Sequence, residues 1–202
     1  MFNNLTLTHF IIIGVVGLVA TTIIVGTVIS TKMNKSSSPT KLGKLEIISA
    51  KTEWKLFESG SVLLDNVFVG GSNSDGGSIY VCRVNSSIAS ELLPGMYDPV
   101  QGSCQMTWGG KTYSYSKFDL LTTNDPSSLV WLGNKDGDVS LGSIVGGLSD
   151  RSDELNIARA MISGGQAIGK VHGRHSKAYV PFAGKETEIF SYEVLCSFDY
   201  KL

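Results

Sequence analysis

Hydrophobic positions divide the chain into one long apolar run and many short ones. The long run, Phe10 to Ile29, contains no charged residue, and the first charge of the chain is Lys32. A helix rises about 1.5 Å per residue, so this run can cross about 30 Å of hydrocarbon. A cleaved signal peptide would need a basic segment and a shorter apolar core. The pattern therefore predicts one transmembrane anchor at residues 10–30, after a flank at residues 1–9.

The pattern becomes polar after this run. Residues 31–43 are rich in serine and lysine, with Ser36-Ser37-Ser38-Pro39 at their centre. Such a segment is too polar to pack, so we expect a short tether. Residues 44–202 then have a usual length for one folded domain.

Within this domain, short β-rich runs alternate with glycine-containing turns. The runs are Ser78–Val84, Gln105–Trp108, Tyr113–Leu121 and Ile189–Phe198. The last of them alternates apolar and polar residues, as a half-buried strand does. The 23 glycines of the chain are spread without a period, which fits many turns rather than a helical bundle. The sequence predicts an all-β domain with antiparallel strands.

The domain contains an internal repeat. Gly70-Gly71 precedes Arg83 by the same spacing as Gly146-Gly147 precedes Arg159. Further glycines and a closing leucine also recur at equal spacing, and the segment after the arginine is two residues longer in the first copy, as expected of a hairpin loop. We expect two pseudo-symmetric antiparallel β units, repeat one at 50–122 and repeat two at 127–198, forming one domain after a single transmembrane helix.

These motifs resemble the DM-nine repeat family. The first copy has Ile79-Tyr-Val-Cys-Arg83, Pro94-Gly95, Gly109-Gly110-Lys111 and Phe118-Asp-Leu-Leu121. The second has Leu155-Asn-Ile-Ala-Arg-Ala160, Gly169-Lys170, Ala178-Tyr-Val-Pro-Phe-Ala-Gly-Lys-Glu186 and Tyr192-Glu-Val-Leu195. The resemblance covers residues 50–198. It implies intertwined β units and, as in characterised relatives, lectin activity toward mannose-type sugars.

The resemblance also implies a binding site. In the sugar-binding relatives, an acidic residue in the turn after the glycine pair and the lysine of a Pro-Gly-Lys motif make the polar contacts. The second copy keeps Lys170 and has Ser149 at the acidic position, with Asp150 beside it. The first copy has Asn73 and Met96 at these positions. We therefore predict one working site, with Lys170 as donor and Asp150 or Ser149 as acceptor.

Sugar recognition has a physical reason to use such a pair. Neighbouring hydroxyls can donate to a carboxylate and accept from an ammonium, and each charge-assisted hydrogen bond contributes about 1.5–3 kcal/mol. The alternative is that Lys170 and Asp150 are ordinary solvated charges.

Other candidates are weaker. Lys185 and Glu186 follow a glycine turn, where charged residues usually cap an exposed hairpin. Aromatic residues could stack on sugar rings, although aromatics at matching points are more often core layers. These residues are Trp54, Trp108, Trp131, Tyr179 and Phe182. His172-Gly-Arg-His175 lacks further ligands at metal-site spacing, so we expect a solvated loop and no metal.

Composition narrows the function classes. The net charge of −1 argues against a nucleic-acid partner, and the chain has no catalytic motif, so we expect a non-enzyme without cofactors. Three cysteines match no zinc or redox spacing, and small buried side chains explain them better than a disulfide framework.

Charges beside the anchor predict its orientation. Lys32, Lys35, Lys41 and Lys44 all follow the apolar run, which favours a cytoplasmic C-terminal domain. Asn85-Ser86-Ser87 points the other way, because this acceptor sequence for N-glycosylation is used only in the secretory lumen.

Two hypotheses follow. The first is a membrane-anchored, lectin-like recognition protein, held in the bilayer through residues 10–29, that binds mannose-type carbohydrate through its second repeat. The alternative is a non-enzymatic structural or scaffold protein of a cellular or viral membrane, whose β domain binds protein partners or a second copy of itself.

Overall fold

The predicted β-rich runs form strands that make up most of the described chain. The structure is a computed structural model, and it describes residues 46–47, 52–197 and 200–201. The flank at 1–9, the anchor at 10–30 and the tether at 31–43 lie outside the described residues. In the described part, helices are limited to two short 3-10 turns, and none could span a membrane.

The strands and 3-10 helices follow one another in a regular series. In chain order they are β1 (Glu46–Ile47), β2 (Thr52–Glu58), β3 (Val69–Ser72), β4 (Ser78–Ser86), β5 (Glu91–Asp98), β6 (Ser103–Trp108), β7 (Lys111–Tyr115), β8 (Lys117–Thr123), η1 (Pro126–Ser128), β9 (Leu129–Lys135), β10 (Val145–Leu148), β11 (Glu154–Ile162), β12 (Gly165–His172), η2 (Gly173–His175), β13 (Lys177–Phe182), β14 (Lys185–Ile189), β15 (Ser191–Ser197) and β16 (Tyr200–Lys201).

The two predicted repeats adopt the same series of strands, β2 to β8 and β9 to β15. Each repeat contains the same partly buried contact around its motif arginine. The arginine pairs with a carboxylate on the neighbouring strand and lies 4.3 Å from the centre of a tryptophan ring. These triplets are Arg83, Asp119 and Trp54 in repeat one, and Arg159, Glu193 and Trp131 in repeat two.

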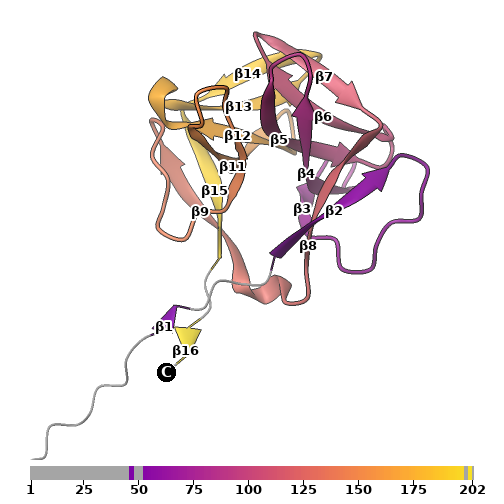
Figure 1. Cartoon of the computed structure of the whole chain (residues 1–202), viewed down its shortest axis with the longest axis horizontal. Coiled ribbons are helices and arrows are strands. Elements are labelled where there is room, and N and C mark those ends of the chain that lie inside the picture. The colour runs from indigo at the N-terminus through magenta and orange to yellow at the C-terminus, as the bar shows by residue number, and fades with distance from the viewer. Residues whose placement is uncertain (1–45, 48–51, 198–199, 202) are drawn as a thin grey trace, which may run out of the picture. The chain divides into compact units, whose positions relative to one another are not determined.

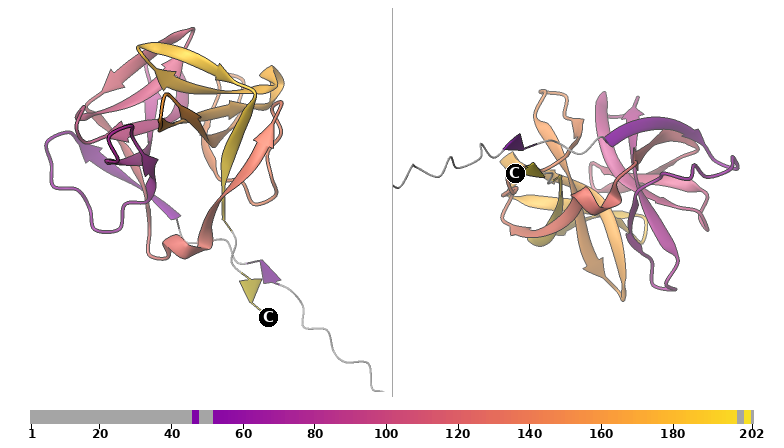
Figure 2. Two further views of the ribbon diagram at one scale, coloured as in Figure 1. Left: turned by 180° about the vertical axis from the view of Figure 1, so that it is seen from behind. Right: turned by 90° about the horizontal axis from the view of Figure 1, so that it is seen from below.

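The strands of both repeats join in one antiparallel sheet. Its main path runs β2-β8-β4-β5-β6-β7-β14-β13-β12-β11-β15-β9, so the repeats meet where β7 pairs with β14. Strand β10 pairs with β11 of its own repeat and with β5 of the other, which closes the central strands into a ring. Figures 1 and 2 show the strands of the two repeats on opposite sides of the domain, with β7 and β14 together where they meet. The pairing of β10 with β5 adds a strand contact across this boundary. The repeats are therefore intertwined.

The core is shared in the same way. One cluster of buried side chains combines Val81 and Leu121 of repeat one with Ile157 and Leu195 of repeat two. Fully burying each such side chain contributes about 1.5–3 kcal/mol. A second cluster lies mainly in repeat one, around the rings of Phe57, Tyr97 and Phe118. Because one cluster spans both repeats, each repeat depends on the other for its core.

Motif glycines allow close approach of neighbouring strands. A Cβ atom at Gly95 would lie 2.2 Å from the carbonyl oxygen of Gln105, and one at Gly169 would lie 2.0 Å from that of Tyr179. Both distances are far below van der Waals contact. These glycines keep β5 against β6 and β12 against β13.

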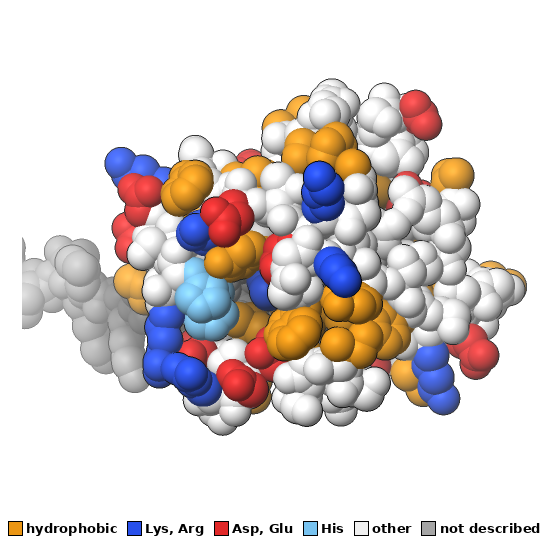
Figure 3. All heavy atoms as spheres, turned by 90° about the horizontal axis from the view of Figure 1, so that it is seen from above, with side chains coloured by type: hydrophobic (Ala, Val, Ile, Leu, Met, Phe, Trp, Pro, Cys, Tyr) orange, Lys and Arg blue, Asp and Glu red, His pale blue; other side chains and the backbone are white. Residues whose placement is uncertain are grey.

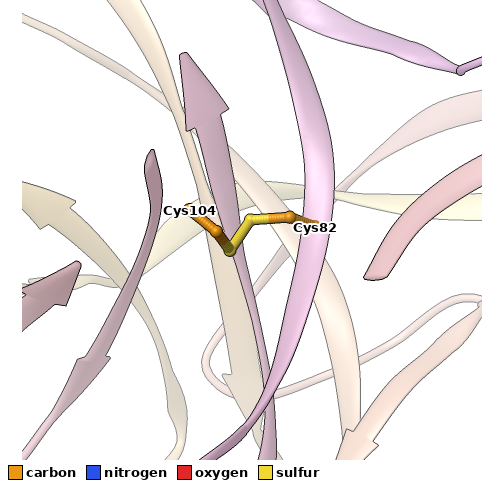
Figure 4. Close-up of a disulfide and its surroundings, with 2 residues drawn as sticks. All are labelled: Cys82 and Cys104. Atoms are coloured by element: carbon orange, nitrogen blue, oxygen red, sulfur yellow. A yellow bond between two sulfur atoms is a disulfide. The ribbon is translucent and has the colours of Figure 1, made fainter. Parts of the chain in front are cut away.

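The expectation for the cysteines is wrong. Cys82 in β4 and Cys104 in β6 form a disulfide, shown in Figure 4, with Cα atoms 6.1 Å apart. Both cysteines are fully buried. Strand β5 lies between their two strands, and its Gly95 lies opposite Cys82. The spacing pattern gave no sign of the pair because the chain reverses twice between the two positions. Cys196 is a buried free thiol, and burial raises its pKa.

The runs Tyr113–Leu121 and Ile189–Phe198 each break into two strands. Strand β7 pairs with β6, whereas β8 pairs with β2 and β4, so the chain turns a corner at Ser116. Repeat two turns at the equivalent Phe190, between β14 and β15. The longer loop between β4 and β5 is confirmed as a hairpin turn.

Candidate functional site

A pocket of about 380 Å³ opens where the two repeats meet. We call it the inter-repeat pocket. Repeat one contributes Glu91 at the start of β5 and Trp108 and Gly109 at the end of β6. Repeat two contributes the remaining lining residues, which are Asp150, Arg151, Asp153, Lys170, His172, Arg174, His175, Tyr179 and Glu186. Figure 3 shows the histidines on this face among basic, acidic and apolar side chains.

Lys170 lies in β12 and is 5% exposed. Its ammonium donates to the carbonyl oxygen and, at 3.1 Å, to the Oγ1 atom of Thr107, and lies 3.0 Å from Oε1 of Glu186. An ammonium has three N–H donors, so these contacts occupy all of them. Burial lowers the pKa of Lys170, and the Glu186 carboxylate opposes that shift.

Glu186 connects the two repeats. Its Oε1 atom receives the Lys170 hydrogen bond, and its Oε2 atom accepts from the backbone N–H of Gly110 at 2.8 Å. The side chains of Lys170 and Glu186 are only 6% and 10% exposed. Breaking such a buried pair by removing one partner typically costs about 3–5 kcal/mol. The pair therefore fixes one wall of the pocket.

Two histidines and a tyrosine form another wall. The rings of His172 and His175 stack with centres 3.8 Å apart, and the Tyr179 hydroxyl lies 3.1 Å from Nδ1 of His175. Burial, and then the neighbouring His175, lowers the pKa of His172. Burial raises the pKa of Tyr179. The short 3-10 helix η2 brings the two imidazoles together by reversing the chain after β12.

The turn between β10 and β11 forms the acidic rim. The Ser149 hydroxyl accepts hydrogen bonds from the N–H groups of Arg151 at 3.2 Å and Asp153 at 3.0 Å. This contact holds the turn and leaves Asp150 exposed beside the pocket. Asp153 pairs with Arg174 at 2.8 Å. Ser149 thus shapes the rim, while Asp150 borders the open space.

A second pocket, of about 250 Å³, is related to the first by the repeat symmetry. We call it the amide pocket. Its lining residues are Asn73, Ser74, Met96, Asp98, Gln101, Gln105, Ile162, Ser163, Gly165, Gln166, Ala167, Pro181, Phe182 and Ala183. The repeat offset places Met96 where the first pocket has Lys170, and Gln105 where it has Tyr179. The two pockets share a backbone but differ in chemistry.

The structure distributes the predicted site residues between these places. Lys170, Asp150 and Glu186 all line the inter-repeat pocket. Asn73 lines the amide pocket, where its Oδ1 atom holds the turn after β3 just as Ser149 holds its own turn. Lys185 is exposed and faces Lys111 across the β7–β14 contact. Within this pocket Lys170 forms an ion pair with Glu186.

The predicted aromatic residues also lie in different places. Trp108 and Tyr179 line the inter-repeat pocket, and Phe182 lines the amide pocket. Trp54 and Trp131 instead pack against the shared core and their arginines.

Sequence reasoning missed Glu91 and treated His172 and His175 as a solvated loop. Glu91 has no sequence signal, since only the closure of β10 onto β5 brings it near repeat two. The histidines did have a sequence signal, because they flank a turn that closely follows the motif lysine, Lys170. Among the described residues, no group of histidine, cysteine and acidic side chains could hold a metal.

Comparison with known proteins now identifies the family. A match to the DM9 repeat spans residues 72–189. The chain belongs to the DM9 repeat family. The match begins in β3 of the first repeat and ends in β14 of the second, so it includes both pockets.

Among the solved structures that match this chain, one illustrates the shared fold. It is the nematode sperm cell motility protein MFP2B, with a TM-score of 0.57 and 17% sequence identity. The alignment covers 82% of this chain and 52% of MFP2B, so the chain spans about half the length of that protein. A search of curated proteins found no match.

Proposed function

We propose that this DM9 domain is a lectin-like module that binds mannose-type carbohydrate in the inter-repeat pocket. The observation that carries the proposal is the combination of an exposed aromatic ring with carboxylates around an open cavity. Trp108 is 37% exposed at the pocket, and Asp150 and Glu91 line the same space. Membership of the DM9 family supports a lectin-like role.

A sugar ring suits this lining. One face of a hexose presents C–H groups, which can pack on an aromatic ring such as Trp108. Its hydroxyls can donate to carboxylates, and each hydrogen bond to a charged group contributes about 1.5–3 kcal/mol. A volume of about 380 Å³ is within the usual range for small-ligand sites.

Lys170 has a positioning role in this proposal. Its three donors are already occupied by Thr107 and Glu186, so it would donate to a sugar only by exchanging one of these acceptors. We assign direct contact to Asp150, Glu91 and Trp108. Lys170 holds Glu186 and the end of β6, which carries Trp108.

We further propose that the domain is attached to a membrane. The uninterrupted apolar run at residues 10–29 supports this part of the proposal. The polar segment at 31–43 would then separate the domain from the bilayer surface.

Glycan-array binding by the full-length chain in detergent tests the proposal. We expect binding to mannose-containing glycans, at least tenfold weaker binding for Trp108→Ala, and weaker binding for Asp150→Ala. Phe182→Ala is the matched control, because Phe182 is the equivalent aromatic residue of the amide pocket and is 39% exposed. This control should bind like the wild type. Absence of binding to every mannose-containing glycan, or loss of binding in the control alone, contradicts the proposal.

A further inference from the structure

Repeat one carries two features of β4 that repeat two lacks. The first is the disulfide from Cys82 to Cys104. The second is the sequence Asn85-Ser86-Ser87, which begins three residues later and runs into the longer hairpin loop. Both features bear on the compartment in which the domain folds.

The disulfide is an addition to the shared fold. The positions of repeat two equivalent to Cys82 and Cys104 are Ala158 and Ala178, which are also fully buried. Two alanines therefore satisfy the same packing, and the cysteines of repeat one are not needed to fill space. Disulfides form and persist in oxidising compartments and are rare in the cytosol. The pair therefore indicates folding on the secretory or extracellular side.

Asn85 is placed for modification. It lies near the end of β4 with its side chain exposed, and within the described residues that side chain makes no hydrogen bond. Ser87 supplies the hydroxyl of the acceptor sequence and is exposed at the start of the loop. The equivalent position in repeat two, Met161, is 67% exposed, so this edge faces solvent in both repeats. A bulky, hydrophilic glycan can be held here without displacing core residues.

We propose that Asn85 carries an N-linked glycan on a domain that folds in the oxidising secretory compartment. The inference does not depend on the proposed sugar-binding function. It is opposite to the orientation that the four lysines after the apolar run predict. The disulfide outweighs those lysines, since a buried bond between two cysteines needs an oxidant, whereas flanking charge only biases insertion.

Expression of the full chain in a eukaryotic secretory cell tests the proposal. We expect a mobility shift on electrophoresis that N-glycosidase removes and that Asn85→Gln and Ser87→Ala both abolish. The chain supplies its own controls, because Asn4-Leu5-Thr6 and Asn34-Lys35-Ser36 are also acceptor sequences, on either side of the apolar run. Asn4→Gln and Asn34→Gln should leave the Asn85-dependent shift in place.

A thiol count on the same membranes gives an independent measurement. After denaturation without reductant, we expect one thiol to react with a maleimide, that of Cys196, and all three cysteines to react after reduction. The proposal is overturned if no shift depends on Asn85, if the shift is lost only in Asn4→Gln, or if three thiols react without reductant.

Discussion

The two pockets of this domain have one backbone and two chemistries. In the inter-repeat pocket, Lys170 and Glu186 form a buried ion pair. In repeat one, the equivalent positions are Met96, which lines the amide pocket, and Thr112, so the cation and the anion are both replaced. A single replacement would have left a buried charge without a partner, which is strongly unfavourable. We therefore expect the pair to behave as one unit.

The polar contacts of the two pockets follow the same geometry. Tyr179 and His175 interact in one, and the equivalent Gln105 and Gln101 interact in the other. The backbone thus brings the same positions together, and the side chains decide whether the pocket is charged and aromatic or neutral and rich in amides. Function can therefore differ between repeats without any change of fold.

Lys170→Met gives the largest expected effect, because it copies repeat one at one position and isolates Glu186. We expect a loss of about 3–5 kcal/mol in the free energy of unfolding, measured with urea. Lys170→Met/Glu186→Thr copies both positions and should recover a large part of that loss. A double variant as unstable as the sum of the two single variants would show that the side chains act independently.

Cys82→Ala/Cys104→Ala copies repeat two. We expect a folded domain whose unfolding free energy falls by about 3 kcal/mol under oxidising conditions, the usual scale for a loop of this order. The wild type in reductant should unfold with a similar midpoint. If reductant leaves the wild type unchanged, the cysteines are not bonded in the folded protein.

The glycine pairs allow a smaller test. A Cβ at Gly147 would lie 1.8 Å from the backbone oxygen of Leu92, whereas one at the equivalent Gly71 would lie 2.3 Å from the Gln166 side chain. We expect Gly147→Ala to cost about 1–3 kcal/mol, because the backbone must shift. Gly71→Ala should cost less, since a glutamine side chain can rotate. Equal losses in thermal unfolding experiments would contradict the close approach of β10 to β5.

The smallest effect concerns pH. The pKa of His172 is lowered in the folded state from its ordinary value of 6.5, so the unfolded chain binds more protons below that pH. The contribution of His172 is fully present above pH 6.5 and is lost as the pH falls through the folded pKa. We expect a loss of less than about 1 kcal/mol, because solvent screens a partly exposed ring. Thermal unfolding from pH 7.5 to 5.5 should change less in His172→Gln than in the wild type.

Sequence patterns alone predicted the all-β class, four strand-forming runs, the glycine turns and the repeat. These features depend on neighbours a few residues apart, such as the alternation at the start of β15 and the glycine turns after β2, β6 and β13. The rest of β15 is buried on both faces, so the predicted half-buried alternation does not continue to its end. The predicted strand boundaries failed where Tyr113–Leu121 crosses between two parts of the sheet, because that corner depends on which partner strands are available.

The lining of the pockets could not be predicted in the same way, because it depends on packing between residues far apart in the chain. Lys170 and Asp150 stood out in a local motif, but Glu91 and Trp108 come from the other repeat and reach the same space because β10 pairs with β5 and β7 pairs with β14. Thr107 occupies two donors of Lys170 from the other repeat, and Glu186 occupies the third from a different strand of the same repeat. Local spacing carries no record of such contacts, nor of the bond between Cys82 and Cys104.

The amino-acid sequence by itself thus determined an all-β protein built from two DM9-like units, since periodicity and turn chemistry act over short distances. Only the tertiary structure decided which side chains share a pocket, which charge pairs with Lys170 and which cysteines are bonded. The physical reason is that strand pairing, within each repeat and between the two, brings together residues far apart in the chain, and burial then makes each of those contacts depend on its specific partner.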